Sequence, residues 1–197
     1  MDLRVYKIIE KTTVEGPHTR FCIWVQGCSR HCKGCYATNT WDKTKGMLIS
    51  TKEIFEKIKK QQDIEGVTFL GGEPFEQAEA LAELAKMIKS IGLGLVTFTG
   101  NIYENLLESQ DAGVKSLLFY TDLLIDGKFE KEKLDYSRAW VGSSNQRYIF
   151  LTNRYSENDV RNAKNKVEIR ISKSGNIFMN GMGDFDKILN DLLLLKK

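Results

Sequence analysis

Three of the four cysteines lie in one short stretch of the sequence. Cys28, Cys32 and Cys35 have the spacing C-x3-C-x2-C, which lets three thiolates converge on one centre from a single loop. Thiolates select zinc or iron–sulfur clusters. Because a cubane cluster normally takes four cysteines, three would leave one iron without a protein ligand, as a catalytic zinc keeps an open position. The spacing therefore favours a reactive centre over a site of electron storage.

The alternative interpretation of these cysteines is a zinc site completed by His31, His18 or Cys22. Cys22 lies in an apolar stretch close to Trp24, where a free cysteine usually behaves as a small buried hydrophobe. We therefore leave Cys22 out of the predicted ligands, and we expect Trp24 and Trp41 to serve packing. The spacing alone does not separate zinc from iron, so other motifs must decide.

A glycine pair followed by an acid supplies a second candidate site. Gly71-Gly72-Glu73-Pro74 lies between an apolar run typical of a strand and a helical pattern. Glycines let a ligand approach the backbone closely, and the carboxylate of Glu73 can accept hydrogen bonds from an ammonium group. Consecutive βα units would bring this turn and the cysteine loop to the same end of a sheet, where ligands bind in α/β folds.

Further polar groups follow the later strands. Thr97 and Thr99 end one predicted strand, Lys128 follows the next, and Ser143 and Asn145 lie in a segment of small polar residues. These side chains would share one rim of the sheet. Ordinary turns between strand and loop would explain them equally well.

Apolar runs alternate with amphipathic stretches along the chain, which predicts βα units around a mainly parallel sheet. We predict parallel strands over residues 20–26, 66–70, 93–99, 123–125 and 147–151, an N-terminal strand over 3–9, and helices over 51–60, 75–88 and 102–109. A hairpin over 167–171 and 177–180 and a terminal helix over 185–195 complete the prediction.

The composition is that of a globular protein, with 42% apolar and 28% charged residues in a chain of 197. We expect one domain over residues 1–197. The 29 basic and 26 acidic residues are interspersed, so no nucleic-acid partner is implied. No apolar run approaches the roughly 20 residues that span a bilayer, and residues 1–11 lack the apolar core of a signal peptide. We expect a cytoplasmic protein without a membrane partner.

The cysteine loop, Gly71–Pro74, Asp126-Gly127-Lys128 and Gly142–Arg147 together resemble the radical S-adenosylmethionine (SAM) activating enzymes, most closely the activators of anaerobic ribonucleoside-triphosphate reductases. The resemblance covers about residues 5–150 and leaves 152–197 as a C-terminal extension. One departure is Gly34, which stands where many radical SAM enzymes have an aromatic residue.

The resemblance implies that Cys28, Cys32 and Cys35 hold three irons of a [4Fe-4S] cluster, while the amino and carboxylate groups of SAM chelate the fourth. Glu73 would orient the methionyl ammonium. The other cofactor-binding residues that the resemblance implies are Gly71, Gly72, Pro74, Thr97, Thr99, Lys128, Ser143 and Asn145.

The family's chemistry is the one-electron cleavage of SAM to methionine and a 5'-deoxyadenosyl radical, which abstracts a hydrogen atom. In an activase the hydrogen comes from a glycine α-carbon of a partner enzyme. The resemblance thus implies a glycyl radical enzyme, such as anaerobic ribonucleotide reductase, as protein substrate, and a reductant of the flavodoxin or ferredoxin type. It also implies a partial open (β/α) barrel followed by the C-terminal β-hairpin and helix.

Two other functions fit parts of the same pattern. A radical SAM enzyme that modifies a peptide or a small molecule would carry the same motifs, because the cluster and cofactor residues do not reveal the hydrogen donor. A non-catalytic metal-binding or electron-transfer module would need the cysteines but not Gly71–Pro74.

We predict that Cys32→Ala abolishes cluster assembly, because it removes one of the three thiolate ligands. Cys22→Ala should leave the iron content of the reconstituted protein nearly unchanged. Iron and sulfide analysis after anaerobic reconstitution checks both variants, and equal iron loss in the two would contradict the ligand assignment.

Overall fold

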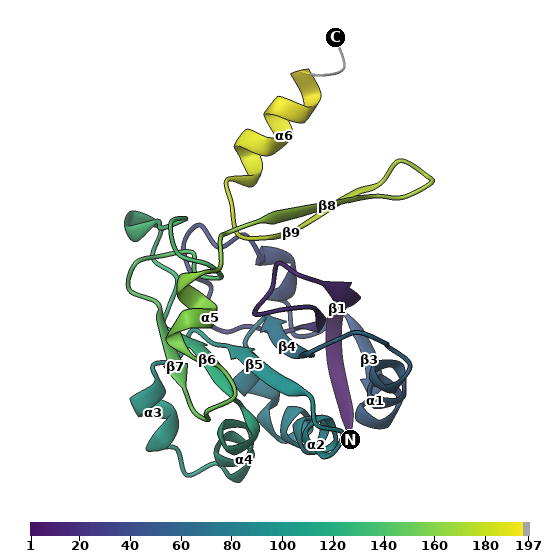
Figure 1. The fold of residues 1–197 in the computed structure, drawn as a ribbon, viewed down its shortest axis with the longest axis vertical. Helices are drawn as coiled ribbons and strands as arrows, with labels where there is room; N and C mark the ends of the chain where they lie inside the picture. The colour runs from purple at the N-terminus through teal and green to yellow at the C-terminus, as the bar shows by residue number, and fades with distance from the viewer. Residues whose placement is uncertain (195–197) are drawn as a thin grey trace.

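The computed structural model describes the backbone of residues 1–194 and the side chains of residues 1–191. Its centre is an open, seven-stranded sheet in the order β3-β1-β2-β4-β5-β6-β7 (Figure 1). The four central strands β2, β4, β5 and β6 are parallel, whereas β1, β3 and β7 run antiparallel to their neighbours. The strands are β1 (Asp2–Thr12), β2 (Arg20–Val25), β3 (Met47–Ser50), β4 (Gly66–Gly71), β5 (Gly94–Phe98), β6 (Leu123–Asp126) and β7 (Arg147–Phe150).

Helices cover one face of this sheet, the lower side in Figure 1. They are α1 (Thr51–Lys59), α2 (Ala78–Ser90), α3 (Tyr103–Leu107) and α4 (Ala112–Tyr120). In α2 the buried residues Leu81, Leu84, Ala85 and Ile88 recur at helical spacing and pack into the main core. Each helix after β4 and β5 carries the chain back to the opposite end of the sheet, so the carboxyl ends of the central strands lie together.

Loops and short elements cover the other face. A smaller core forms there where Trp140 and Val141 pack with Val96 and Ile125 of the sheet. Tyr155 joins this core at the start of the C-terminal extension. The cysteine loop leaves β2 at the carboxyl end of the parallel strands, which places it beside the turn after β4.

The predicted parallel core is confirmed, but the sheet does not close. Its edge strands β3 and β7 are not paired with each other, so the barrel part of the prediction is not confirmed. The predicted parallel strand 147–151 is wrong: β7 runs antiparallel to β6. The connection between them contains no α-helix to return the chain to the other end of the sheet, and a parallel pair needs such a crossover.

The sequence prediction also lacked strand β3, helix α4 and, in the C-terminal extension, helix α5 (Glu157–Arg161). Strand β3 is an edge strand of only four residues, and its apolar Met47 and Leu48 are exposed. Helix α4 begins at Asp111, whose carboxylate accepts hydrogen bonds from the amides of Gly113 and Val114 at 2.7 and 3.1 Å. An aspartate at this position is the sequence signal that could have predicted the start of α4. The predicted helix over 102–109 corresponds to the shorter α3.

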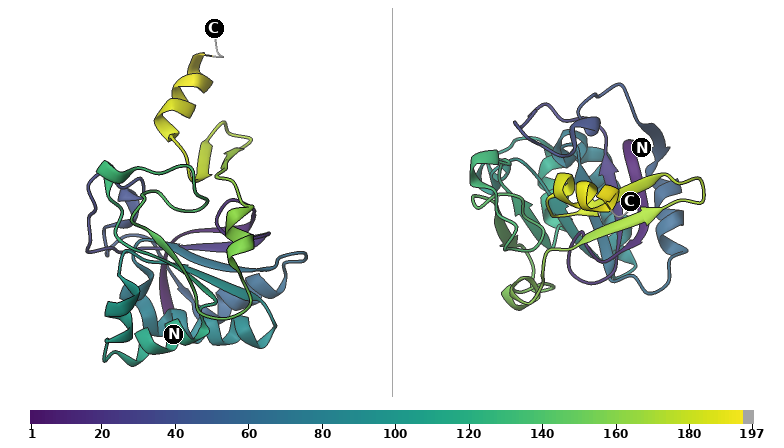
Figure 2. Two further views of the ribbon diagram at one scale, coloured as in Figure 1. Left: turned by 60° about the vertical axis from the view of Figure 1, so that its left-hand side comes forward. Right: turned by 90° about the horizontal axis from the view of Figure 1, so that it is seen from above.

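The C-terminal extension consists of α5 (Glu157–Arg161), the hairpin β8 (Val167–Ile171) and β9 (Ile177–Gly181), and α6 (Phe185–Leu194). The hairpin confirms the prediction and lies against the segment after β1, where Glu15 accepts a 2.6 Å hydrogen bond from the amide of Gly181. Helix α6 extends away from the sheet (Figure 2). Residue 195 of the predicted helix lies outside the described residues, and no described helix is long and apolar enough to cross a bilayer.

A buried arginine ties the start of β2 to its neighbours. Arg20 is fully buried and donates hydrogen bonds to the Thr68 hydroxyl at 2.6 Å, the Val67 and Gly94 carbonyls, and the Tyr155 hydroxyl at 2.8 Å. The guanidinium carries several fixed donors, so one side chain satisfies acceptors from two strands, β4 and β5, and from the extension.

We predict that Arg20→Met lowers the free energy of unfolding by about 3 kcal/mol, because it leaves several buried acceptors without donors. Tyr155→Phe removes a single hydroxyl from the same network and should cost about 1 kcal/mol. Urea denaturation measures both, and an Arg20→Met protein as stable as the wild type would contradict the role of this side chain.

Candidate metal and ligand site

The cysteine loop begins at the end of β2 and is closed by its own backbone. The amide of Gly27 donates to the Thr40 carbonyl at 2.6 Å, and that of Cys28 to the Trp41 carbonyl at 3.1 Å. Beneath the loop, the Gln26 side chain donates to two further carbonyls of the returning segment. These hydrogen bonds hold the two ends of the loop together, so the three cysteines lie on one compact loop.

N–H donors face two of the three cysteine sulfurs. The backbone amides of Arg30 and His31 face the Cys28 sulfur, while the Ala37 amide and the Trp41 side chain face that of Cys35. Burial raises the pKa of both thiols, and these hydrogen bonds oppose the rise. Donors aimed at sulfur stabilise the thiolate form that a metal requires.

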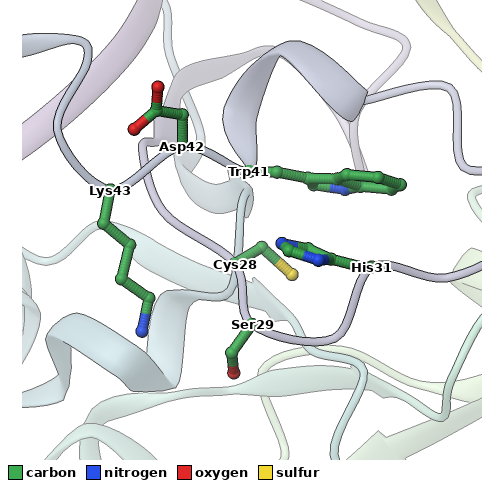
Figure 3. Close-up of a pocket in the computed structure, with 6 residues that line it drawn as sticks. All are labelled: Cys28, Ser29, His31, Trp41, Asp42 and Lys43. Atoms are coloured by element: carbon green, nitrogen blue, oxygen red, sulfur yellow. The ribbon is translucent and has the colours of Figure 1, made fainter.

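A pocket of about 470 Å³ opens beside Cys28 and is lined by Ser29, His31, Trp41, Asp42 and Lys43 (Figure 3). The His31 imidazole stacks on the Trp41 indole with ring centroids 4.5 Å apart. The cysteine loop thus has one face open to solvent. Trp41, which we expected only to pack, lines this pocket beside Cys28.

The structure bears on the zinc alternative. Cys22 is fully buried in β2, where burial raises the pKa of its thiol well above the ordinary value. His18 lies near Asp159 at 3.9 Å, in contact with α5. Of the three proposed fourth ligands, His31 is therefore the one that lies in the cysteine loop.

The donor set fits an iron–sulfur cluster by its chemistry. Three cysteines on one loop, with N–H groups directed at the sulfurs of Cys28 and Cys35, suit a thiolate-ligated cluster. Among the described residues no three His, Cys, Asp or Glu side chains converge at metal-ligating distances. The three cysteines are therefore candidate ligands that are not gathered at metal-ligating distances in the described part of the chain.

The glycine turn after β4 is hydrogen-bonded directly to the start of the cysteine loop. The Gly72 amide donates to the Val25 carbonyl at 2.9 Å, and the Glu73 amide to the Gly27 carbonyl at 2.8 Å. A Cβ at Gly72 would overlap the Gly27 carbonyl oxygen. Gly71 has φ +103°, which a side chain would strain. The two glycines therefore permit the contact that joins the predicted metal loop to the predicted ligand turn.

This contact buries the carboxylate of Glu73, which is 2% exposed. Its Oε1 accepts hydrogen bonds from the Thr99 hydroxyl at 2.7 Å and the Phe75 amide at 3.1 Å. Its Oε2 accepts from the Gly100 amide at 2.9 Å and from Arg30 Nε at 3.2 Å. Burial raises the pKa of Glu73, and these four donors oppose the rise. Pro74 follows at the first position of a short 3-10 helix and is itself buried.

Three residues of this arrangement escaped the sequence reasoning. Arg30 lies between Cys28 and Cys32 and reaches across to Glu73, while its Nη2 donates to the side-chain oxygen of Asn101. The third, Gly100, contributes its amide. Arg30 lies inside the cysteine motif and Gly100-Asn101 directly after Thr99, so adjacency to predicted site residues was the available signal.

The other predicted cofactor residues are not gathered at Glu73. The Thr97 hydroxyl pairs with that of Thr121 at 3.0 Å, on the sheet face that α4 covers. Lys128 has an exposed side chain, and its carbonyl accepts a 2.7 Å hydrogen bond from the Asn145 amide. The buried Ser143 hydroxyl accepts from the Glu130 amide at 3.2 Å. In the structure Ser143 and Asn145 therefore brace the loop that carries Lys128.

The model of the 4Fe-4S single cluster domain family matches residues 14–149 of the chain. Curated relatives match about two thirds of the chain. The chain is 37% identical over 142 residues to the anaerobic ribonucleoside-triphosphate reductase-activating protein of Vibrio cholerae, covering 68% of this chain and 88% of the relative. The protein of the same name from Enterobacteria phage T4 is 33% identical over 141 residues, covering 68% and 85%.

The Escherichia coli (strain K12) relative, which also bears this name, is 30% identical over 142 residues, covering 68% of this chain and 89% of its own length. Among solved structures, QueE from Escherichia coli is similar over 51% of this chain and 54% of that one, with 21% identity and a TM-score of 0.44. That structural likeness is too slight to bear on the fold.

We predict that Gly72→Ala disrupts the joint between the two loops, because the added methyl group meets backbone rather than a movable side chain. Stability should fall by about 2–3 kcal/mol and iron retention should fall with it. Gly92→Ala is the matched control: it has no atom within 4 Å of the new Cβ, and its φ of +79° should cost about 1 kcal/mol. Equal stability of the two variants would contradict the proposed joint.

Proposed function

Because the chain belongs to the family of anaerobic ribonucleoside-triphosphate reductase-activating proteins and contains the 4Fe-4S single cluster domain, we propose that it reductively cleaves SAM and installs a glycyl radical on a partner enzyme. The partner would be an anaerobic ribonucleotide reductase or a similar glycyl radical enzyme. The proposal rests on family membership and on the chemistry of the site.

The observation that supports it most is the buried Glu73 carboxylate beside the cysteine loop. A carboxylate that is 2% exposed at the carboxyl end of a parallel strand is costly to bury unless it binds donors. Its backbone is bonded to the residue before Cys28, so a molecule held by Glu73 would also lie next to the metal loop. The amino-acid end of a ligand carries an ammonium and a carboxylate on one carbon. The ammonium would bind Glu73, and the carboxylate would then lie next to the metal loop.

When bound, the cluster supplies the single electron that breaks a carbon–sulfur bond of SAM, giving methionine and a 5'-deoxyadenosyl radical. The protein's part is to bind and orient the reactants. Glu73 would accept the methionyl ammonium, and Thr99 and Gly100 would fix the orientation of the Glu73 carboxylate. Held in this way, the sulfonium would be presented to the cluster in one geometry.

Transfer of a hydrogen atom to the 5'-deoxyadenosyl radical completes the proposed reaction. The 5'-deoxyadenosyl radical would take a hydrogen atom from a glycine α-carbon of the partner, forming 5'-deoxyadenosine and leaving the unpaired electron on that glycine. One electron enters per event, and we propose that a reductant of the flavodoxin or ferredoxin type supplies it. Because the sheet does not close, we propose that a loop of the partner reaches the site from its open side.

Anaerobic reconstitution with iron and sulfide, followed by reduction in the presence of SAM, tests the proposal. We expect 5'-deoxyadenosine by chromatography, and a glycyl radical signal by electron paramagnetic resonance when an anaerobic ribonucleotide reductase is added. 5'-Deoxyadenosine without a glycyl radical would favour a peptide or small-molecule substrate. A well-formed cluster with no SAM cleavage would favour an electron-transfer module and overturn the proposal.

We predict that Glu73→Gln lowers SAM cleavage at least about tenfold, because a neutral amide gives up a charge-assisted hydrogen bond to the ammonium. Iron content should stay near the wild-type value. Glu79→Gln removes an exposed carboxylate from the same segment and is the control. Rates are measured as 5'-deoxyadenosine formed per cluster; equal rates in the two variants would contradict the role of Glu73.

A further inference from the structure

The Arg30 side chain extends from the cysteine loop, and its guanidinium lies against the Glu73 carboxylate. Its Nε lies 3.2 Å from Glu73 Oε2, and its Nη2 donates to the Asn101 side chain. The Arg30 side chain is 28% exposed, against 3% for that of Glu73. The guanidinium thus covers the buried carboxylate on its solvent side.

The neighbouring backbone is shaped to admit this side chain. A Cβ at Gly100 would lie 2.5 Å from Arg30 Cδ and 2.9 Å from its Nε. The same Gly100 donates its amide to Glu73. Any larger residue at this position would push the guanidinium away from the carboxylate, so the glycine permits the Arg30–Glu73 pair.

Arg30 completes the hydrogen bonding of Glu73. A carboxylate offers about four lone-pair sites on its two oxygens. Thr99 and Phe75 occupy two on Oε1, and Gly100 and Arg30 occupy two on Oε2. Three of these donors have fixed positions: the backbone amides of Phe75 and Gly100, and the buried Thr99 hydroxyl. Arg30 is the donor on a long, partly exposed side chain, and it is the one that can leave.

We propose that Arg30 stands in for the α-ammonium group of the ligand. In the ligand-free protein the Arg30 guanidinium binds the Glu73 carboxylate, and it must be displaced before the amino-acid end of a ligand can bind there. This inference rests on the proposed function and adds a specificity-determining residue to it. With all four sites filled, an incoming ammonium reaches Glu73 only as Arg30 withdraws. The buried carboxylate therefore keeps a counter-charge in both states.

Displacement makes binding selective for the ammonium. A ligand with this cation replaces the contact that Arg30 gives up, whereas a ligand without it leaves Arg30 in place and gains nothing from Glu73. The cost of displacement also lowers the affinity for the proper ligand, since the apparent dissociation constant rises as the open fraction falls. Removal of Arg30 should therefore tighten the binding of ammonium-bearing ligands and leave other ligands unaffected.

The test compares two probes on the reconstituted protein by calorimetric titration. S-adenosylhomocysteine carries the α-ammonium and 5'-methylthioadenosine lacks it. We expect Arg30→Ala to bind S-adenosylhomocysteine about 3- to 10-fold more tightly than the wild type and 5'-methylthioadenosine equally. Arg30→Lys, which retains the cation, should stay closer to the wild type. Lys33→Ala, which removes an exposed cation of the same loop, should change neither affinity.

Thermal unfolding supplies a second readout. Without ligand, Arg30→Ala should be less stable than the wild type, because Glu73 loses its counter-charge. Under saturating S-adenosylhomocysteine the difference should vanish, since Glu73 then binds the ligand's ammonium in both proteins and Arg30 of the wild type no longer contacts it. A stability difference that persists at saturation, or weaker or unchanged S-adenosylhomocysteine binding in Arg30→Ala, would overturn the inference. If the wild type itself fails to bind S-adenosylhomocysteine, the proposed function falls together with it.

Discussion

Two backbone hydrogen bonds between the turn after β4 and the first residues of the cysteine loop determine the geometry of the site. They run from the amides of Gly72 and Glu73 to the carbonyls of Val25 and Gly27. They form because Gly72 has no Cβ to separate the two segments. The parallel pairing of β2 with β4 brings the two loops to the same end of the sheet, and these bonds then fix their distance. The predicted metal loop and the predicted ligand turn therefore lie against each other.

The same joint explains why a carboxylate can be buried there. Once the turn packs against the loop, Glu73 is shielded from water and needs hydrogen-bond donors from the protein. The next strand delivers Thr99 and Gly100 at the required positions, and the metal loop delivers Arg30. Elements after three successive strands thus meet at one carboxylate. If Arg30 is displaced as we propose, the charge balance of this carboxylate links the cysteine loop to ligand binding.

Much of this arrangement could be predicted from the sequence, and the remainder has physical reasons. The cysteine spacing and the Gly-Gly-Glu turn are local patterns, so the sequence alone could propose the cysteine loop and Glu73 as candidate site residues. The central strands were recognisable because both faces of a parallel sheet are covered and the runs are apolar. The predicted direction of β7 was wrong because the amino-acid composition of a strand does not encode its direction. Thr97 was predicted as a cofactor-binding residue because the sequence does not reveal which face of the sheet a strand residue occupies; that depends on how the strand pairs with its neighbours.

The hydrogen-bond partners of Glu73 could not be assigned from the sequence for another reason. Arg30 approaches Glu73 from a different loop, and that approach exists only after β2 and β4 have paired. A long flexible side chain has no sequence signature for the acceptor that it finds. The C-terminal extension was predicted as a hairpin and a helix, yet its anchoring through Glu15 and Tyr155 depends on buried acceptors and donors of the core.

The central claim is that the cysteine loop and Glu73 form a single ligand site. Pulsed electron paramagnetic resonance of the reduced, reconstituted protein with SAM labelled with nitrogen-15 at the amino group tests this most directly. The account predicts a nitrogen-15 hyperfine coupling to the cluster in the wild type and its loss in Glu73→Gln, with the cluster signal retained. No coupling in the wild type, or an unchanged coupling in Glu73→Gln, would contradict it.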